Sequence, residues 1–167
     1  ADVRPAPGPA TPGAFPQGVA SGDPSATSVL LWTRVEAAGR TAPVSIRWEV
    51  TANDDNATAV LASGQAQTSG ARDWTVTVTA SGLQPGTYYR YRFFDDSRPG
   101  GTGTSVVGRT RTASSGSVSK VRLGVAACST YPTGWFHAYR HLANKSMDAF
   151  ILLGDYIYEY GQDAQTT

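Results

Sequence analysis

The sequence predicts a chain of two parts, an all-β sandwich of two sheets followed by the start of an α/β domain. Two observations lead to this fold class. Residues 15–112 contain short segments in which apolar and polar residues alternate, with turn residues between them, as in β-sandwiches. Residues 120–167 instead contain two continuous apolar runs with a helical pattern between them, which indicates a strand–helix–strand unit.

The composition and net charge of the chain argue against some classes of function. The chain has 167 residues, of which 40% are hydrophobic, and its net charge is +1. This charge gives no reason to expect a nucleic-acid-binding surface, and the apolar runs are far shorter than the roughly 20 residues of a transmembrane helix. The proline-rich residues 1–14 are expected to be disordered or extended, as at the start of a secreted, extracellular protein whose signal peptide has been removed.

The strands of the sandwich are assigned from their side-chain patterns. Strands are predicted at residues 28–35, 44–50 and 74–79, and after a turn within 83–93. In the second of these, every other residue from Val44 to Val50 is apolar, so one face should be buried. Trp32 and Trp48 are expected to lie in the core. Ser21-Gly-Asp-Pro24 is interpreted as a tight turn.

The turn that precedes the last strand resembles the tyrosine corner of fibronectin type III and immunoglobulin-like sandwiches. Leu83, Pro85 and Gly86 set the turn, and Tyr89 would be the corner tyrosine. We therefore expect a sandwich of this type over residues 15–112. The polar residues 113–119 that follow are expected to form a flexible linker.

Both apolar runs after the linker end in residues with metal-binding chemistry. A strand predicted at 121–127 leads to Cys128, the only cysteine, and a second at 150–153 leads to Asp155 and Tyr158. Continuous apolar runs are typical of parallel strands buried on both faces. Because a right-handed crossover puts the carboxyl ends of both strands on one edge, we expect these three side chains to lie close together.

Each of the three residues also has an ordinary structural interpretation. A lone cysteine such as Cys128 is usually a small buried hydrophobe, Asp155 could cap a turn, and Tyr158 could be a core aromatic. Taken alone, the cysteine is weak evidence for ligation. The downstream aspartate and tyrosine favour the metal interpretation for all three.

Three segments in order along the chain carry a family resemblance. They are Phe15-Pro-Gln-Gly-Val-Ala-Ser-Gly-Asp-Pro24 with Val29-Leu-Leu-Trp-Thr-Arg34, then Gly124-Val-Ala-Ala-Cys-Ser129, then Leu153-Gly-Asp-Tyr-Ile-Tyr-Glu159. Together they resemble the PhoD-like alkaline phosphatases, a family that includes secreted, metal-dependent phospholipase D-type phosphodiesterases. The Gly-Asp-x-x-Tyr element is shared with purple acid phosphatases.

The resemblance implies a metal centre. Fe³⁺ would be bound by the thiolate of Cys128, the carboxylate of Asp155 and the phenolate of Tyr158, with Ca²⁺ beside it. Anionic sulfur and phenolate donors do stabilise ferric over ferrous iron, and calcium prefers oxygen ligands. Asp155 would bridge the metals and act in catalysis. A metal-activated water would then hydrolyse phosphodiesters or phosphomonoesters, phospholipids included.

The resemblance also implies that residues 120–167 are the truncated start of a metallophosphatase domain, an αββα sandwich. Two parallel strands cannot cover their own faces. We therefore expect a complementary C-terminal fragment of the same protein, as a separate chain, to pack against them and to supply the remaining ligands. The sequence does not decide which phosphoester is preferred.

Two other functions account for parts of the sequence. A non-catalytic, fibronectin-like adhesion or binding module explains residues 15–112 but not the three metal-binding residue types at strand ends. A zinc hydrolase could use His137 and His141, which are four residues apart on a helix predicted at 133–144, but no third ligand is evident there. The roles of Arg140 and Glu159 stay open.

Overall fold

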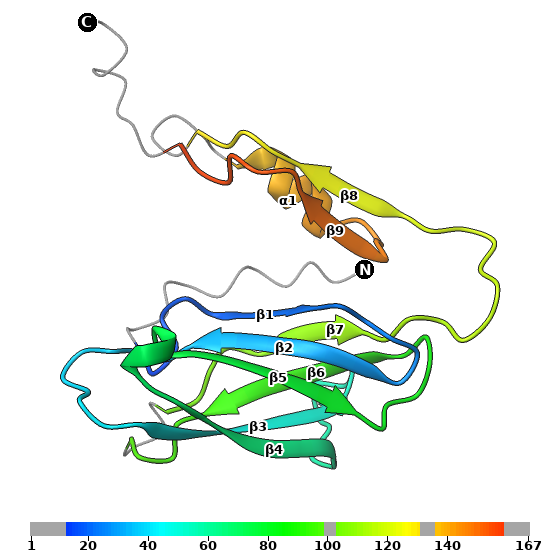
Figure 1. The fold of residues 1–167 in the computed structure, drawn as a ribbon. Helices are drawn as coiled ribbons and strands as arrows, with labels where there is room; N and C mark the ends of the chain where they lie inside the picture. The colour runs from blue at the N-terminus through cyan, green and yellow to red at the C-terminus, as the bar shows by residue number, and fades with distance from the viewer. Residues whose placement is uncertain (1–12, 99–102, 131–135, 159–167) are drawn as a thin grey trace, which may run out of the picture. The chain divides into compact units, whose positions relative to one another are not determined.

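The structure is a computed structural model that describes residues 13–98, 103–130 and 136–158. The chain divides into two compact units after Ser117, within the segment predicted as a linker (Figure 1). The first unit contains β1 (Val19–Gly22), β2 (Ser28–Arg34), β3 (Val44–Ala52), β4 (Val60–Thr68), the short 3-10 helix η1 (Gly70–Arg72), β5 (Thr75–Ser81), β6 (Tyr88–Phe94) and β7 (Gly108–Arg111). The second contains β8 (Leu123–Ala126), α1 (His137–Ala143) and β9 (Ala149–Leu152).

The first unit is a sandwich of two antiparallel sheets, in agreement with the predicted all-β fold. One sheet has the strand order β1-β2-β5 and the other β4-β3-β6-β7. Alternate residues of β2, β3 and β6 are buried, because each strand presents one face to the opposite sheet. Figure 1 shows the two sheets layered on each other. Their inward side chains form one continuous core.

The face predicted for residues 44–50 is confirmed, since Val44, Ile46, Trp48 and Val50 are all buried. The expectation for Trp32 is wrong: it lies on the outward face of β2 and is only half-buried. Its neighbour Thr33 is fully buried in its place. The Thr33 hydroxyl can occupy the interior because it donates to the carbonyl oxygen of Gly18 at 2.8 Å.

Three strands, β1, β4 and β7, were not predicted. β1 includes Ser21 and Gly22, so the predicted turn is a strand end followed by Asp23 at a φ of 45°. In β4 the residues that face the core are small, which hides the alternation. Gly64 lies opposite Trp48, and a Cβ on Gly64 would be 2.9 Å from the indole ring. The strand therefore uses small residues to make room for the large ones of β3.

Tyr89 is a tyrosine corner, as predicted. Its ring is buried, and its hydroxyl accepts a hydrogen bond from the backbone N–H of Gln84 at 2.7 Å. The same turn is held by Thr112, whose hydroxyl donates to the carbonyl oxygen of Gln84 at 2.6 Å. The packed region extends slightly beyond 15–112, because Ala14 is fully buried and Ala113 N–H donates to Ser25 O at 2.8 Å.

One carboxylate is buried in the first unit. The Asp95 side chain has no exposed surface and forms ion pairs with Arg40 and, at 3.5 Å, with Arg98. Its oxygen Oδ1 also accepts hydrogen bonds from the Ser97 N–H and hydroxyl. Several donors around a buried carboxylate compensate for its desolvation. Asp95 therefore fastens the chain after β2 to the chain after β6.

The second unit is a strand–helix–strand unit. β8 and β9 pair in parallel, with Leu123 opposite Ala149 and Ala126 opposite Leu152. The helix α1 contacts the strands through Tyr139, whose ring centroid is 6.3 Å from that of Phe150. The predicted helix began at residue 133, but residues 131–135 lie outside the described part of the chain.

The prediction that these strands are buried on both faces is wrong for this chain. Val125 keeps 49% of its surface exposed, Phe150 47% and Leu153 70%. Apart from Gly124 and Ala126, every residue of the two strands is exposed. The reason is that the second unit contributes one helix of seven residues, too little to cover two strands.

Candidate metal centre

The chain continues to pair beyond the ends of β8 and β9. Leu153 N–H donates to Ala126 O at 3.0 Å, and Ser129 N–H donates to Asp155 O at 3.2 Å. Further on, Tyr158 N–H donates to Ser129 O at 2.7 Å, and Thr130 forms a parallel bridge with Tyr158. These bonds hold the two segments in register after the strands end. The residues that follow each strand are thereby brought to one edge.

Cys128, Asp155 and Tyr158 meet at this edge, as their positions after parallel strands predicted. The Sγ atom of Cys128 is 3.8 Å from Oδ2 of Asp155 and 3.7 Å from the hydroxyl oxygen of Tyr158. Cys128 and Asp155 are exposed to solvent, and the thiol is free. The structure therefore presents a sulfur atom and two kinds of oxygen to one small volume.

The backbone at this edge is unusual. Cys128 has a φ of 59° and Asp155 a φ of 45°, both in the left-handed region that non-glycine residues rarely adopt. Gly154 precedes Asp155 with a φ of 103°. From these two positions the side chains approach each other to 3.8 Å between Sγ and Oδ2. Such conformations cost about 1–3 kcal/mol each and are found most often at functional sites.

The electrostatics of the site keep Tyr158 protonated. The Asp155 carboxylate, by hydrogen bonding, and the Cys128 thiol beside it raise the pKa of the Tyr158 phenol well above its usual range. Both neighbours favour the neutral phenol because it can donate a hydrogen bond that a phenolate cannot. A cation bound beside the phenol oxygen would instead lower the pKa of Tyr158.

Two residues at the site were not singled out from the sequence. The Ser129 hydroxyl and the Tyr139 hydroxyl are 2.6 Å apart, so α1 is hydrogen-bonded to the segment that carries Cys128. The Tyr139 ring also lies 6.1 Å from that of Phe136. The helical pattern of this segment predicted a helix but not a contact between these two hydroxyl groups. The hydroxyl contact depends on where α1 lies against β8.

The other candidate residues do not join this group. His137 and His141 lie on α1 with exposed side chains, as does Arg140. Within the described ranges, no group of three or more histidine, cysteine, aspartate or glutamate side chains could hold a metal ion. The zinc interpretation thus has no third ligand there. Tyr156, which follows Asp155, is 62% exposed, and Glu159 lies outside the described residues.

Comparison with known proteins identifies the family. Residues 3–114 match the PhoD-like phosphatase N-terminal domain, and residues 123–167 match the PhoD-like phosphatase domain. The chain belongs to the PhoD-like phosphatase family. Both parts of the chain carry the match, in the order that the sequence motifs predicted.

Two relatives of the family are similar over most of this chain. The sequence is 38% identical over 155 residues to alkaline phosphatase D from Bacillus subtilis (strain 168), which covers 88% of this chain. A solved structure of PhoD is 36% identical, covers 92% of the chain and superposes with a TM-score of 0.76. The chain spans only 26% of the first protein and 30% of the second. In the described part of the chain, no helix has the length and apolar character needed to cross a membrane.

Proposed function

We propose that this chain contributes part of the active site of a secreted, metal-dependent phosphoesterase. The observation that carries the proposal is the meeting of Cys128, Asp155 and Tyr158 beyond two parallel strands. In open α/β sheets, ligands bind at the carboxyl ends of the strands, which is where these residues lie. The family membership and the name of the Bacillus relative support a phosphatase-type hydrolase.

The donor set fits a trivalent cation. Ligands at about 2.0–2.3 Å from one ion stand roughly 3–4 Å from each other, and the sulfur–oxygen distances of 3.8 Å and 3.7 Å fall in that range. A thiolate, a carboxylate and a phenolate together bring three negative charges. Such anionic donors favour Fe³⁺, whereas a neighbouring Ca²⁺ would share the oxygens of Asp155.

The protons at the site are part of the proposed chemistry. Without a cation, the Tyr158 phenol keeps its proton because Asp155 and Cys128 raise its pKa. Ligands must be deprotonated to bind a metal, so binding releases the protons of the phenol and the thiol. The site should therefore take up its cation more readily as the pH rises.

When bound, the metal supplies charge for a phosphoryl group and activates a water molecule. This chain's residues hold and orient the ligating atoms. The left-handed turns at Cys128 and Asp155 fix their side chains, and the Ser129–Tyr139 hydroxyl contact fixes the segment against α1. The proposed reaction is hydrolysis of a phosphodiester or phosphomonoester, with phospholipids among the possible substrates.

The rest of the site would come from a complementary C-terminal part of the protein. The support is the exposed apolar surface of the second unit, which includes Val125, Phe150 and Leu153. The chain also spans about a quarter of the curated relative. Additional strands and helices packed on β8 and β9 would bury this surface and supply further ligands.

The test is metal analysis of the protein assembled with its complementary part. We expect bound iron and a violet colour from charge transfer between phenolate and iron. Tyr158→Phe should bleach the colour, Cys128→Ser should weaken iron retention, and Tyr156→Phe, at an exposed neighbouring tyrosine, should change neither. A colourless, iron-free preparation with full activity would refute the proposal.

A further inference from the structure

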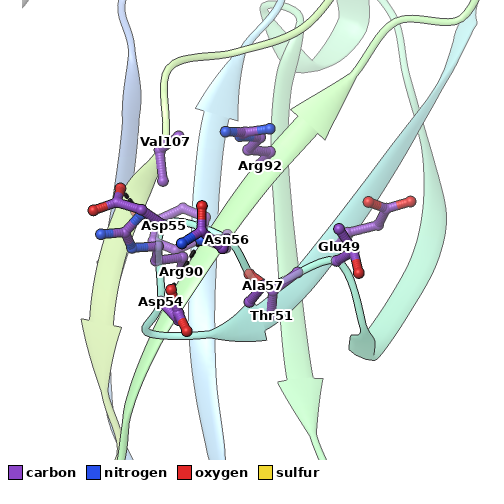
Figure 2. Close-up of a pocket in the computed structure, with 11 residues that line it drawn as sticks. Glu49, Thr51, Asp54, Asp55, Asn56, Ala57, Arg90, Arg92 and Val107 are labelled. Carbon is purple, nitrogen blue, oxygen red and sulfur yellow. Dashed lines mark hydrogen bonds and ion pairs between the residues drawn. The ribbon is translucent and has the colours of Figure 1, made fainter.

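The first unit has a pocket of its own on the outward face of the four-stranded sheet. Its volume is about 530 Å³, within the range of small-molecule sites. Outward residues of β3 and β6 form the floor, and the loop between β3 and β4 forms a wall (Figure 2). The charged and amide side chains of the lining are Glu49, Asp54, Asp55, Asn56, Arg90 and Arg92.

Of the two arginines that line the pocket, Arg92 has no carboxylate partner among the described residues. Arg90 is paired with Asp55 from the loop. Glu49 lies directly opposite Arg92 in the strand register, but its carboxylate is paired with Arg47. Arg92 is exposed and forms no ion pair with any residue that the structure describes. Figure 2 shows its guanidinium lying apart from the Glu49 carboxylate.

The two arginines nearest to this part of the sheet, Arg90 and Arg109, have contacts of their own. Arg109 on β7 lies directly opposite Arg90, and like charges in such cross-strand pairs repel each other. Only Arg90 of this pair is matched by a carboxylate in the described residues. The Arg109 guanidinium lies over the Tyr88 ring, 4.4 Å from its centroid, and does not line the pocket, so Arg92 is the guanidinium that would bind an anion there.

The opposite wall of the pocket is polar and acidic. Asp54 accepts a hydrogen bond from the backbone N–H of Asn56 at 2.9 Å, which holds the loop in a turn. This bond leaves carboxylate and amide oxygens along the wall that can accept hydrogen bonds from hydroxyl groups. The pocket thus offers the guanidinium of Arg92 on one side and hydrogen-bond acceptors on the other.

We propose that this pocket binds a small polyhydroxylated oxyanion, with the phosphate or carboxylate group on Arg92 and the hydroxyl groups toward Asp54 and Asn56. Arginine binds both kinds of oxyanion through paired N–H donors. The site lies entirely in the first unit. It is independent of the metal centre and of the proposed hydrolysis, so either proposal can fail without the other.

The test is calorimetric titration of the whole chain in the presence of a chelator, which prevents turnover at the metal centre. The probes are glucose, gluconate and glucose 6-phosphate, which share a polyol and differ in the anionic group. We expect gluconate or glucose 6-phosphate to bind and glucose not to bind. Preference between the two anions distinguishes a carboxylate ligand from a phosphate ligand.

Two variants locate the binding. Arg92→Gln removes the free guanidinium, and we expect it to weaken binding by about tenfold or more. Arg72→Gln removes an exposed arginine on η1, outside the pocket, and should leave the affinity unchanged. Equal weakening by both variants would mean non-specific attraction and would overturn the proposal. Absence of binding by either anion, or equal binding of glucose, would overturn it as well.

Discussion

Cys128 and Asp155 are 27 residues apart in the sequence, yet their side chains approach to 3.8 Å between Sγ and Oδ2. Both residues are in the left-handed backbone region, at φ values of 59° and 45°. Two such conformations facing each other are costly for a protein that has no use for them. The arrangement fits the cation site proposed at the ends of these two parallel strands.

The first prediction concerns the ionisation of Tyr158. Its pKa is raised in the metal-free protein, so the hydrogen bonds of the neutral phenol are fully present below the ordinary tyrosine pKa of about 10. They are lost as the pH rises through the raised pKa. In ultraviolet titrations, the absorbance change from tyrosinate formation should therefore be the same for the wild type and Tyr158→Phe at about pH 10. Added Fe³⁺ should make that difference appear at neutral pH. Identical curves with and without the cation would contradict ligation by Tyr158.

The second prediction concerns the corner tyrosine. Tyr89→Phe removes the acceptor of the Gln84 N–H, and we expect it to lower the free energy of unfolding of the sandwich by about 1–2 kcal/mol. Tyr88→Phe is the control, because Tyr88 points outward beside Arg109 and Arg111 and its ring is retained. Urea denaturation of both variants measures the difference. Equal losses would show that the corner bond contributes nothing.

The third prediction tests the close contact between β3 and β4. Gly64→Ala places a methyl group 2.9 Å from the Trp48 ring, so the ring or the edge strand must move. Overpacking of this kind costs about 1–3 kcal/mol. Gly116→Ala, where a Cβ would meet nothing within 4 Å, should be close to neutral. Thermal unfolding of the two variants provides the comparison, and an unaffected Gly64→Ala variant would show that the contact adapts without cost.

The fourth prediction concerns the buried ion pairs. Asp95→Asn leaves Arg40 and Arg98 without their carboxylate partner, and we expect a loss of about 3 kcal/mol in unfolding free energy. Asp96→Asn is a matched neighbour, since Asp96 is 63% exposed and pairs with Arg47 at the surface. That change should cost less than about 1 kcal/mol. If chemical denaturation gave the two variants the same stability, burial of Asp95 would have no energetic role.

Much of this architecture could be predicted from local patterns. The alternation in β3 identified its buried face, and the turn before Tyr89 identified the corner. The meeting of Cys128 with Asp155 followed from the rule that parallel strands end on one edge. These features depend on a few neighbouring residues or on chain topology alone.

Other features depend on partners that a local pattern does not show. The residues before Thr33 are apolar at successive positions, so the sequence does not show which face of β2 is buried. Thr33 is buried because its hydroxyl donates a hydrogen bond to the carbonyl oxygen of Gly18, which is distant in the sequence. β4 was not predicted because its core-facing residues are small. At Gly64, for example, the Trp48 ring of β3 occupies the space that a side chain would need. The unpaired Arg92 likewise results from Glu49 pairing with Arg47, a choice that strand spacing does not determine.

The exposed sheet of β8 and β9 has a thermodynamic consequence. Folding of the sandwich is driven by its own interior, whereas the proposed metal-binding edge belongs to a unit whose described strands are almost entirely exposed. We therefore expect the order of that edge to depend mainly on the proposed cation and on the elements that would cover the strands. If the proposed site is correct, loss of either would unfold this edge while leaving the sandwich native, so calorimetry should record two separate transitions, of which only the lower responds to iron.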